Sequence, residues 1–142
     1  MAITQLSAFL ANTPGTLSQA VSAISEAGIN LRALSVADTT DFGVLRVIVS
    51  DIEKAKDVLG EHTIVSETPV IAVKMDDRPG SLKEILHILD EAQINIEYVY
   101  AFTSPSGSAY VVMRVNDNEE AEAVLQEKGK IILCDADMTE LM

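Results

Sequence analysis

Two stretches of the sequence repeat each other at a spacing of 65 residues. The stretch "TPGTL" at 13–17 recurs as "RPGSL" at 78–82, and "GIN" at 28–30 recurs as "QIN" at 93–95. The segments between these motifs share apolar residues at the spacing of a helix with one buried stripe, namely Leu17, Ala20, Val21, Ile24 and Ala27 in one copy and Leu82, Ile85, Leu86, Leu89 and Ala92 in the other. Several elements matching in one order exclude chance, so the chain is an internal duplication.

The second part of each copy matches at a spacing of 66 residues. Asp51 and Leu59 correspond to Asp117 and Leu125. We place the extra residue in the polar turn around 104–107, because surface turns tolerate insertions. Asp51 and Asp117 each precede a short apolar helix pattern and are predicted to be N-caps.

Each half is predicted to have the element order βαββαβ. The first strands are expected at 3–11 and 70–76, the hairpin turns near 39–43 and 104–107, and the last strands near 62–67 and 130–136. We therefore predict an α+β fold of two ferredoxin-like repeats, whose antiparallel sheets carry their helices on one face. The repeats are assigned to residues 1–68 and 69–142, with Pro69 at their junction.

Composition limits the partners of such a chain. The formal net charge of −12 argues against nucleic acid, because phosphate binding requires many lysine and arginine residues. No apolar run is long enough to cross a membrane, and the N-terminus lacks the pattern of a signal peptide. The single cysteine, Cys134, cannot form an internal disulfide, so we expect the cytoplasm.

The repeated Pro-Gly turn is expected to open a helix. Either Pro14 and Pro79 occupy the first helical position, or Thr16 with Gln19 and Ser81 with Glu84 form capping boxes. In both cases free backbone N–H groups point out of the turn at the positive end of a helix, where a carboxylate can bind.

Two asparagines strengthen this interpretation. Asn12 precedes the first turn and Asn30 opens the second strand. An asparagine amide can accept a hydrogen bond from an ammonium group and donate one to a carboxylate, so the pair would suit the two ends of an α-amino acid. The plainer alternatives are an Asx-turn for Asn12 and a turn or helix-end residue for Asn30.

These motifs resemble those of ACT domains. The residues Asn12, Thr13, Pro14, Gly15, Thr16 and Leu17 with Asn30, and Asp77, Arg78, Pro79, Gly80, Ser81 and Leu82 with Asn95, give two copies that together span the chain. The resemblance implies a stand-alone regulatory protein that binds a small molecule, most often an amino acid, at interfaces between ACT units. It implies that these residues form the ligand site and that the chain is a homodimer, with an enzyme of amino-acid metabolism as a possible partner. Asp77 stands where the family pattern has asparagine, which puts equal occupancy of the two sites in doubt.

Other chemistry has little support in the sequence. His62, His87 and Cys134 lack the spacing of metal ligands, and Asp135 and Asp137 are expected on a solvated face of the last strand. No nucleophile–base pattern and no phosphate-binding loop appears, so we predict no catalytic residue, no metal and no cofactor. The competing hypotheses are a ligand-free interaction subunit that assembles on a metabolic enzyme and, as a distant third, a small acylphosphatase-like enzyme.

Overall fold

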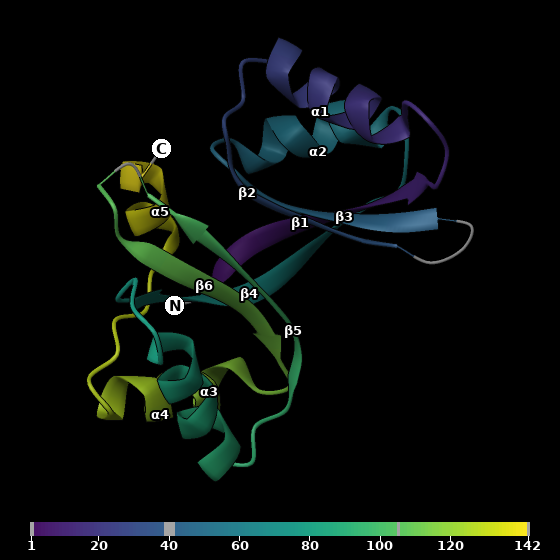
Figure 1. Ribbon diagram of the computed structural model, residues 1–142. Helices are drawn as coiled ribbons and strands as arrows, with labels where there is room; N and C mark the ends of the chain where they lie inside the picture. The colour runs from purple at the N-terminus through teal and green to yellow at the C-terminus, as the bar shows by residue number, and fades with distance from the viewer. Residues whose placement is uncertain (1, 39–41, 105, 142) are drawn as a thin grey trace. The chain divides into compact units, whose positions relative to one another are not determined.

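The computed structural model describes residues 2–38, 42–104 and 106–141 (Figure 1). The described residues form six strands and five helices, in the order β1 (Ile3–Ala11), α1 (Thr16–Glu26), β2 (Leu31–Asp38), β3 (Phe42–Val49), α2 (Ile52–Gly60), β4 (Val65–Met75), α3 (Ser81–Glu91), β5 (Ile96–Thr103), β6 (Ala109–Val115), α4 (Asn118–Glu127) and α5 (Asp135–Leu141). They divide into an N-terminal unit, Thr4–Thr68, and a C-terminal unit, Pro69–Leu141 with the start of the chain up to Ile3. The predicted fold class of two ferredoxin-like βαββαβ repeats is confirmed.

The N-terminal unit is a sheet covered by two helices. Its strand order is β2-β3-β1-β4, and β3 pairs antiparallel with both β1 and β2. The helices α1 and α2 lie beside each other on one face of this sheet (Figure 1). Alternate strand residues and the inner stripes of both helices form the buried core, which consists of Leu6, Ala8, Leu10, Ala20, Ile24, Ile29, Leu45, Val47, Val49, Ala55 and Leu59.

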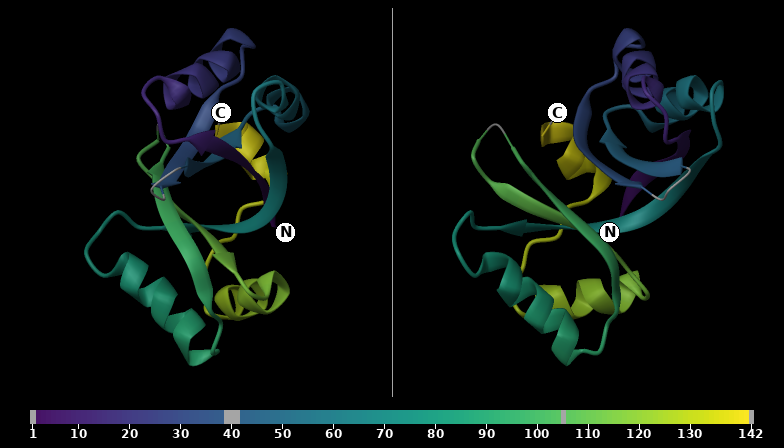
Figure 2. Two further views of the ribbon diagram at one scale, coloured as in Figure 1. Left: turned by 90° about the vertical axis from the view of Figure 1, so that its right-hand side faces the viewer. Right: turned by 45° about the vertical axis from the view of Figure 1, so that its right-hand side comes forward.

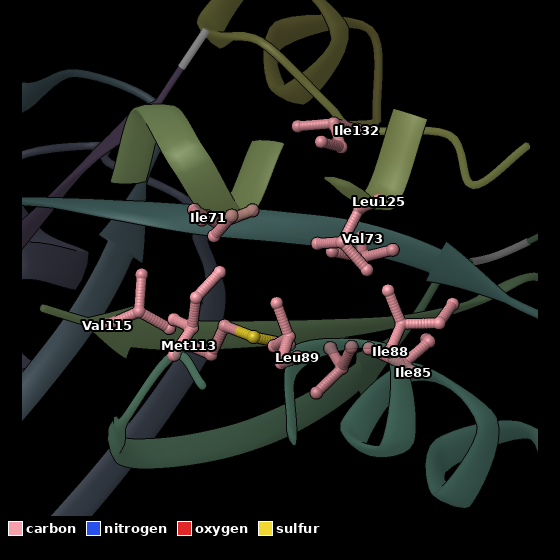
Figure 3. Close-up of a cluster of buried hydrophobic side chains, with 12 residues drawn as sticks. Ile71, Val73, Ile85, Ile88, Leu89, Met113, Val115, Leu125 and Ile132 are labelled. Carbon is pink, nitrogen blue, oxygen red and sulfur yellow. The ribbon is translucent and has the colours of Figure 1, made fainter. Parts of the chain in front are cut away.

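The C-terminal unit repeats this arrangement. Its strand order is β4-β6-β5, with antiparallel pairing throughout, and α3 and α4 lie on one face (Figure 2). Figure 3 shows side chains from both layers meeting in the core, including Ile71 and Val73 from β4, Leu89 from α3 and Met113 from β6. The same apolar spacing in the two copies therefore produces the same two-layer core.

Strand β4 differs from the separate strands predicted around the junction. The expected last strand of the first half and the first strand of the second half are one element, Val65–Met75. Pro69 lies within it, and its carbonyl oxygen accepts a hydrogen bond of 3.4 Å from the Asn118 side chain. The boundary between the compact units falls immediately before Pro69.

The last strand predicted near 130–136 is wrong, because this segment forms only a single bridge and then a helix. Ile132 forms an isolated bridge to Val73, and the chain then enters α5, on the side of the sheet away from α3 and α4 (Figure 2). The backbone N–H of Cys134 donates to Asp137 Oδ2 over 2.8 Å. This bond and the two aspartates in the first turn favour a helix start, since carboxylates stabilise the positive end of a helix. Asp135 and Asp137 therefore lie on a helix and not on a strand face.

The predicted helix stripes are correct at Ala20 and Ile24 and at Ile85 and Leu89, but Val21 and Leu86 are only half-buried and the first leucine of each stripe is exposed. Ala20 and Ile24 in α1 and Ile85 and Leu89 in α3 are buried as expected, whereas Leu17 is 40% exposed and Leu82 is 37% exposed. Both leucines lie in the first helical turn.

The extra residue of the second copy lies in the predicted hairpin. Asp38 of β2 pairs with Gly43 of β3, and the equivalent pair in the second copy is Thr103 with Ala109. The equivalence shifts from 65 to 66 residues between these strands, as predicted. Residues 39–41 and 105 of the two predicted turns lie outside the described part of the chain.

Candidate functional site

The two Pro-Gly turns have the same backbone geometry. Gly15 and Gly80 are the N-cap residues of α1 and α3, with φ values of 87° and 92°. Only glycine adopts this left-handed conformation without the steric cost that a Cβ atom would bring. The glycines are thus required by the backbone of the turn itself.

Hydrogen bonds in the two turns also correspond one to one. The N–H of Thr13 donates to the Ala11 carbonyl, and the N–H of Arg78 donates to the Asp76 carbonyl. Two further bonds recur, from Thr16 to Thr13 and from Gln19 to Gly15 in the first copy, and from Ser81 to Arg78 and from Glu84 to Gly80 in the second. Duplication has therefore preserved a specific turn and not only its residue types.

Both predicted helix starts were wrong in detail. Pro14 and Pro79 precede the N-cap and do not occupy the first helical position, and neither Thr16 nor Ser81 is an N-cap. The glycine cap takes the place of the expected capping box because the turn needs a positive φ at that position.

A glycine cap leaves backbone donors free. Gly15 has no side chain to accept from the first helical turn, and no side-chain cap is made at either helix. The N–H groups of Leu17 and Ser18 in α1, and of Leu82 and Lys83 in α3, have no carbonyl four residues before them within the helix. The prediction of free turn amides at a positive helix end therefore agrees with the observed helix starts.

Asn12 borders a pocket of about 280 Å³ in the N-terminal unit. The pocket is lined by Thr13 and Leu17 from the turn, by Leu10 and Ala11 from β1, and by Val36 and Gly43 from β2 and β3. Asn12, Thr13 and Leu17 are exposed, so these groups are accessible to a solute. The turn thus combines amide donors, an asparagine amide and apolar side chains in one place.

Asn30 lies at the opposite end of the same unit. Asn12 follows Ala11, which pairs with Phe42, whereas Asn30 precedes Leu31, which pairs with Val49. Seven residues of extended β3 separate those two pairs, about 23 Å at 3.3 Å per residue. One unit therefore does not bring Asn12 and Asn30 together, because α1 carries the chain from one end of the sheet to the other.

The backbone of Asn30 has a structural role that recurs at Asn95. The N–H of Asn30 donates to Ser50 Oγ over 2.9 Å, and the N–H of Ser50 donates to the Asn30 carbonyl over 3.0 Å. Asn95 forms the same reciprocal pair with Asn116, at 2.9 Å and 3.2 Å. These pairs join the start of the second strand to the end of the third. Both asparagines are exposed.

The second turn carries charges that the first lacks. Arg78 lies 3.5 Å from Asp76 and 3.7 Å from Glu84, and no ion pair joins it to Asp77 among the described residues. Lys130 Nζ lies 2.6 Å from Glu84 Oε1. The hydrogen bond and charge of Lys130 hold the pKa of Glu84 below its ordinary value of 4.5.

A further difference lies at the first residue of each helix. Thr16 Oγ1 and Thr13 Oγ1 are 2.7 Å apart and share a hydrogen bond. Ser81 replaces Thr16 and Arg78 replaces Thr13, which leaves the buried Ser81 hydroxyl, 6% exposed, with no hydrogen-bond partner among the described residues. The second turn has therefore lost one internal contact of the first.

Sequence reasoning missed a second pocket beside the first turn. This pocket of about 150 Å³ lies between β1, the start of α1 and the segment after α2, and its lining includes Phe9, Gln19, His62 and Thr63. Of its lining residues, Thr16 alone belongs to the Pro-Gly motif. These residues come together only through the order of the strands, in particular through which strand lies beside β1. The sequence signal that could have pointed to them is that the two copies carry different residues at these positions.

The described residues hold no group of three or more histidine, cysteine, aspartate or glutamate side chains that could bind a metal ion. His87 is exposed and lies 3.2 Å from Glu91 on its own helix, as expected for a residue off the buried stripe. Within the described part of the chain, no helix is long and apolar enough to span a membrane.

Comparison with known proteins identifies relatives over the full chain. A family model described as an ACT domain pair matches residues 1–142. The crystal structure of protein BT0572 from Bacteroides thetaiotaomicron superposes with a TM-score of 0.91 at 37% sequence identity, covering 99% of this chain and 98% of that one. No curated protein is significantly similar in sequence.

Two regulatory subunits of aspartate kinase share the fold. The subunit from Thermus thermophilus has a TM-score of 0.67 and 17% identity, and the subunit from Thermus flavus has a TM-score of 0.63 and 17% identity. In each case 87% of this chain and 88% of the other are covered.

Proposed function

Because the chain belongs to the family of ACT domain pairs, we propose that it is a non-catalytic regulatory protein that binds an amino acid. We assign its two ACT repeats to residues 1–68 and 69–142. Its setting is the cytoplasm, in keeping with the single Cys134. Backbone amides and asparagine side chains can bind a zwitterion, but they do not gain or lose protons at neutral pH. These groups therefore support ligand binding and not catalysis.

The observation that carries this proposal is the backbone geometry that the two turns share. Free N–H groups at the start of α1 would receive the ligand carboxylate, because the helix dipole favours negative charge there. The Asn12 carbonyl would accept from the ammonium group. Leu17 and Val36, which line the same pocket, would contact the ligand side chain.

Asn30 would enter the site from another copy of the chain. It lies about 23 Å from Asn12 along the sheet of the same unit. A site that uses both residues must therefore take them from two copies of the chain. This separation supports a homodimer in which Asn12 of one copy faces Asn30 or Asn95 of another. The remaining motif residues, Pro14, Gly15 and Thr16 in one turn and Pro79, Gly80, Ser81 and Leu82 in the other, hold the turns in shape.

Asp77 disfavours a carboxylate at the second turn. A like charge about 4 Å from the ligand carboxylate costs on the order of 4 kcal/mol at an effective dielectric constant near 20. Arg78 is adjacent, but it pairs with Asp76 and Glu84. We therefore propose that the turn with Asn12 binds more tightly than the turn with Asp77.

The second candidate is a ligand-free subunit that assembles on a metabolic enzyme. The side chains of Leu34 and Val36 are exposed on β2, an edge strand of the N-terminal unit. Unpaired edges with apolar side chains favour strand addition by a partner.

A thermal-shift screen against the common amino acids separates the two candidates. A ligand that binds only the folded state stabilises it by about 2.7 kcal/mol at a concentration of 100 Kd, which raises the melting temperature by several degrees. We expect at least one amino acid to produce such a shift and Asn12→Ala to reduce it. Absence of any shift across the whole panel would favour the ligand-free subunit.

A further inference from the structure

The open face of the N-terminal sheet, which is the side away from α1 and α2 (Figure 1), carries exposed aromatic side chains. Leu10 of β1 belongs to the core under the helices, so Phe9 before it points to the open face. Val44 of β3 is the partner of Phe9 across the strands, and Ala37 of β2 is the partner of Val44, so both share this face. Phe42 lies two residues before Val44 on the same face, and its ring centre is 6.5 Å from that of Phe9.

These side chains form one surface, which we call the aromatic patch and which consists of Phe9, Ala37, Phe42 and Val44. Phe9 is 44% exposed and Phe42 is 48% exposed. A phenylalanine side chain presents about 200 Å², so each of the two leaves about 90 Å² in water. The third phenylalanine of the chain, Phe102, is only 9% exposed. Two exposed rings that touch each other are typical of an interaction surface.

The C-terminal unit treats the same face of its sheet differently. Its residues at the positions of Phe9 and Phe42 are Lys74 and Ser108, so the positions that meet water are polar there. Its residues at the positions of Ala37 and Val44 are Phe102 and Tyr110, which stack on each other and are buried. Helix α5 lies on this side of the C-terminal sheet (Figure 2), and the described residues of the N-terminal unit include no such helix. The fold itself therefore does not require the exposed phenylalanines.

Charge indicates which partner the aromatic patch fits. The chain has a formal net charge of −12, so two copies repel each other wherever acidic surfaces meet. On the described part of β1, β2 and β3, no acidic side chain is among the exposed or half-buried residues of the open face, which are Phe9, Ala11, Ser35, Ala37, Phe42, Val44 and Arg46. Two copies can therefore approach through this face with little repulsion, and the positive charge of Arg46 favours an acidic partner such as the chain itself.

We propose that the aromatic patch binds the aromatic patch of a second copy of the chain, so that two N-terminal sheets pack face to face. A two-fold contact brings a surface against itself, which an uncharged apolar surface tolerates. Sheets that pack in this way lie about 10 Å apart with their side chains between them. The rings of Phe9 and Phe42 form the centre of the contact, where aromatic side chains contribute most, and Ser35 and Arg46 belong to its polar rim.

This contact is separate from the site that contains Asn12. The Asn12 pocket includes Leu17 of α1 and Val36 of β2, and Val36 pairs with the core residue Leu45, so that pocket lies on the helix side of the sheet. The inference rests on the proposed function only in that the chain associates with itself, and it names a second surface for that association.

Sedimentation velocity of the full chain over a dilution series tests the contact. The double variant Phe9→Lys/Phe42→Ser carries the residues that the C-terminal unit has on the same backbone. We expect it to weaken self-association by roughly tenfold or more, because it removes the aromatic centre of the interface. The control Val99→Lys/Ile131→Ser changes residues that are 41% and 57% exposed in the other unit, and it should leave self-association as in the parent chain.

NMR of an equal mixture of isotope-labelled and unlabelled parent chains identifies the surface directly. We expect intermolecular NOEs from the rings of Phe9 and Phe42 to the Val44 methyl groups, and this measurement decides the question even if the double variant does not fold. A monomeric parent chain, unchanged association in a folded double variant, or intermolecular NOEs confined to other surfaces would overturn the inference. If these NOEs appeared while no amino acid shifted the melting temperature, the contact would stand and the proposed ligand binding would be rejected.

Discussion

Glu84 and Lys130, which are 46 residues apart in the sequence, meet as an ion pair with 2.6 Å between Oε1 and Nζ. The residue equivalent to Glu84 in the first copy is Gln19, beside Thr63. The same backbone therefore carries a charged contact in one unit and an uncharged pocket in the other. This difference separates two copies whose turns share the same backbone hydrogen bonds.

The Glu84 ion pair predicts a pH effect. The pKa of Glu84 is lowered in the folded chain, chiefly by the Lys130 hydrogen bond and charge. The pair's contribution to stability is therefore fully present above the ordinary pKa of 4.5, and it is lost as the pH falls through the lowered value. Carbon-13 NMR titration of the Glu84 carboxyl should give a pKa below 4.5, and Lys130→Met should raise it. An unchanged pKa in the variant would contradict the pairing.

Alanine at Gly15 or Gly80 should destabilise the chain by roughly 1–2 kcal/mol, the cost of a left-handed conformation for a residue with a Cβ atom. Space is not the obstacle, because a Cβ atom at either glycine would meet nothing within 4 Å. Urea denaturation measures the loss. The matched control is Gly60→Ala in α2, where φ is not positive and alanine should be neutral or stabilising. Equal effects at all three glycines would refute the argument from φ.

The second helices should depend on their aspartate caps. Asp51 accepts a hydrogen bond from Lys54 N–H at 3.1 Å, and Asp117 accepts one from Glu120 N–H at 3.0 Å. Replacing either aspartate with alanine should cost about 1 kcal/mol in the free energy of unfolding. Asparagine at either position should restore most of the loss, since it also caps well. If asparagine proved as harmful as alanine, the cap would not be the cause.

The two leucines of α3 should respond very differently to truncation. Leu89 is fully buried in the core of the C-terminal unit, whereas Leu82 is 37% exposed. Leu89→Ala should destabilise the chain by about 2–5 kcal/mol, and Leu82→Ala by much less. Thermal and urea unfolding of the two variants measures the loss of stability. A comparable loss at both positions would contradict the burial of Leu89 and the exposure of Leu82.

Much of the fold follows from the duplication read with helix and strand periodicity. The first strand and the two Asp caps were predictable because each depends on residues near one another in the sequence, and the place of the extra hairpin residue was predictable from the change in spacing between the two copies. The last strand was not predictable in the same way. Its apolar residues at 131–134 suit a strand, but the bond from the Cys134 N–H to the Asp137 carboxylate begins α5 instead.

The site was less predictable than the fold. The motif located both turns, but Gly15 and Gly80 became the caps because the backbone demands a positive φ there. The sequence also suggested that the fold gathers Asn12 and Asn30, and the strand register places them at opposite ends. The pocket beside Gln19 and His62 depends on tertiary neighbours that no local pattern records.

Calorimetric titration of the parent chain, Asn12→Ala and Asp77→Ala with the amino acid that raises the melting temperature most tests the central proposal. We predict saturable binding to the parent chain, at least tenfold weaker binding to Asn12→Ala, and an unchanged tightest affinity in Asp77→Ala. If Asn12→Ala kept the tightest affinity while Asp77→Ala abolished it, the assignment of the turns would be wrong. If no common amino acid bound the parent chain, the proposed function itself would be contradicted.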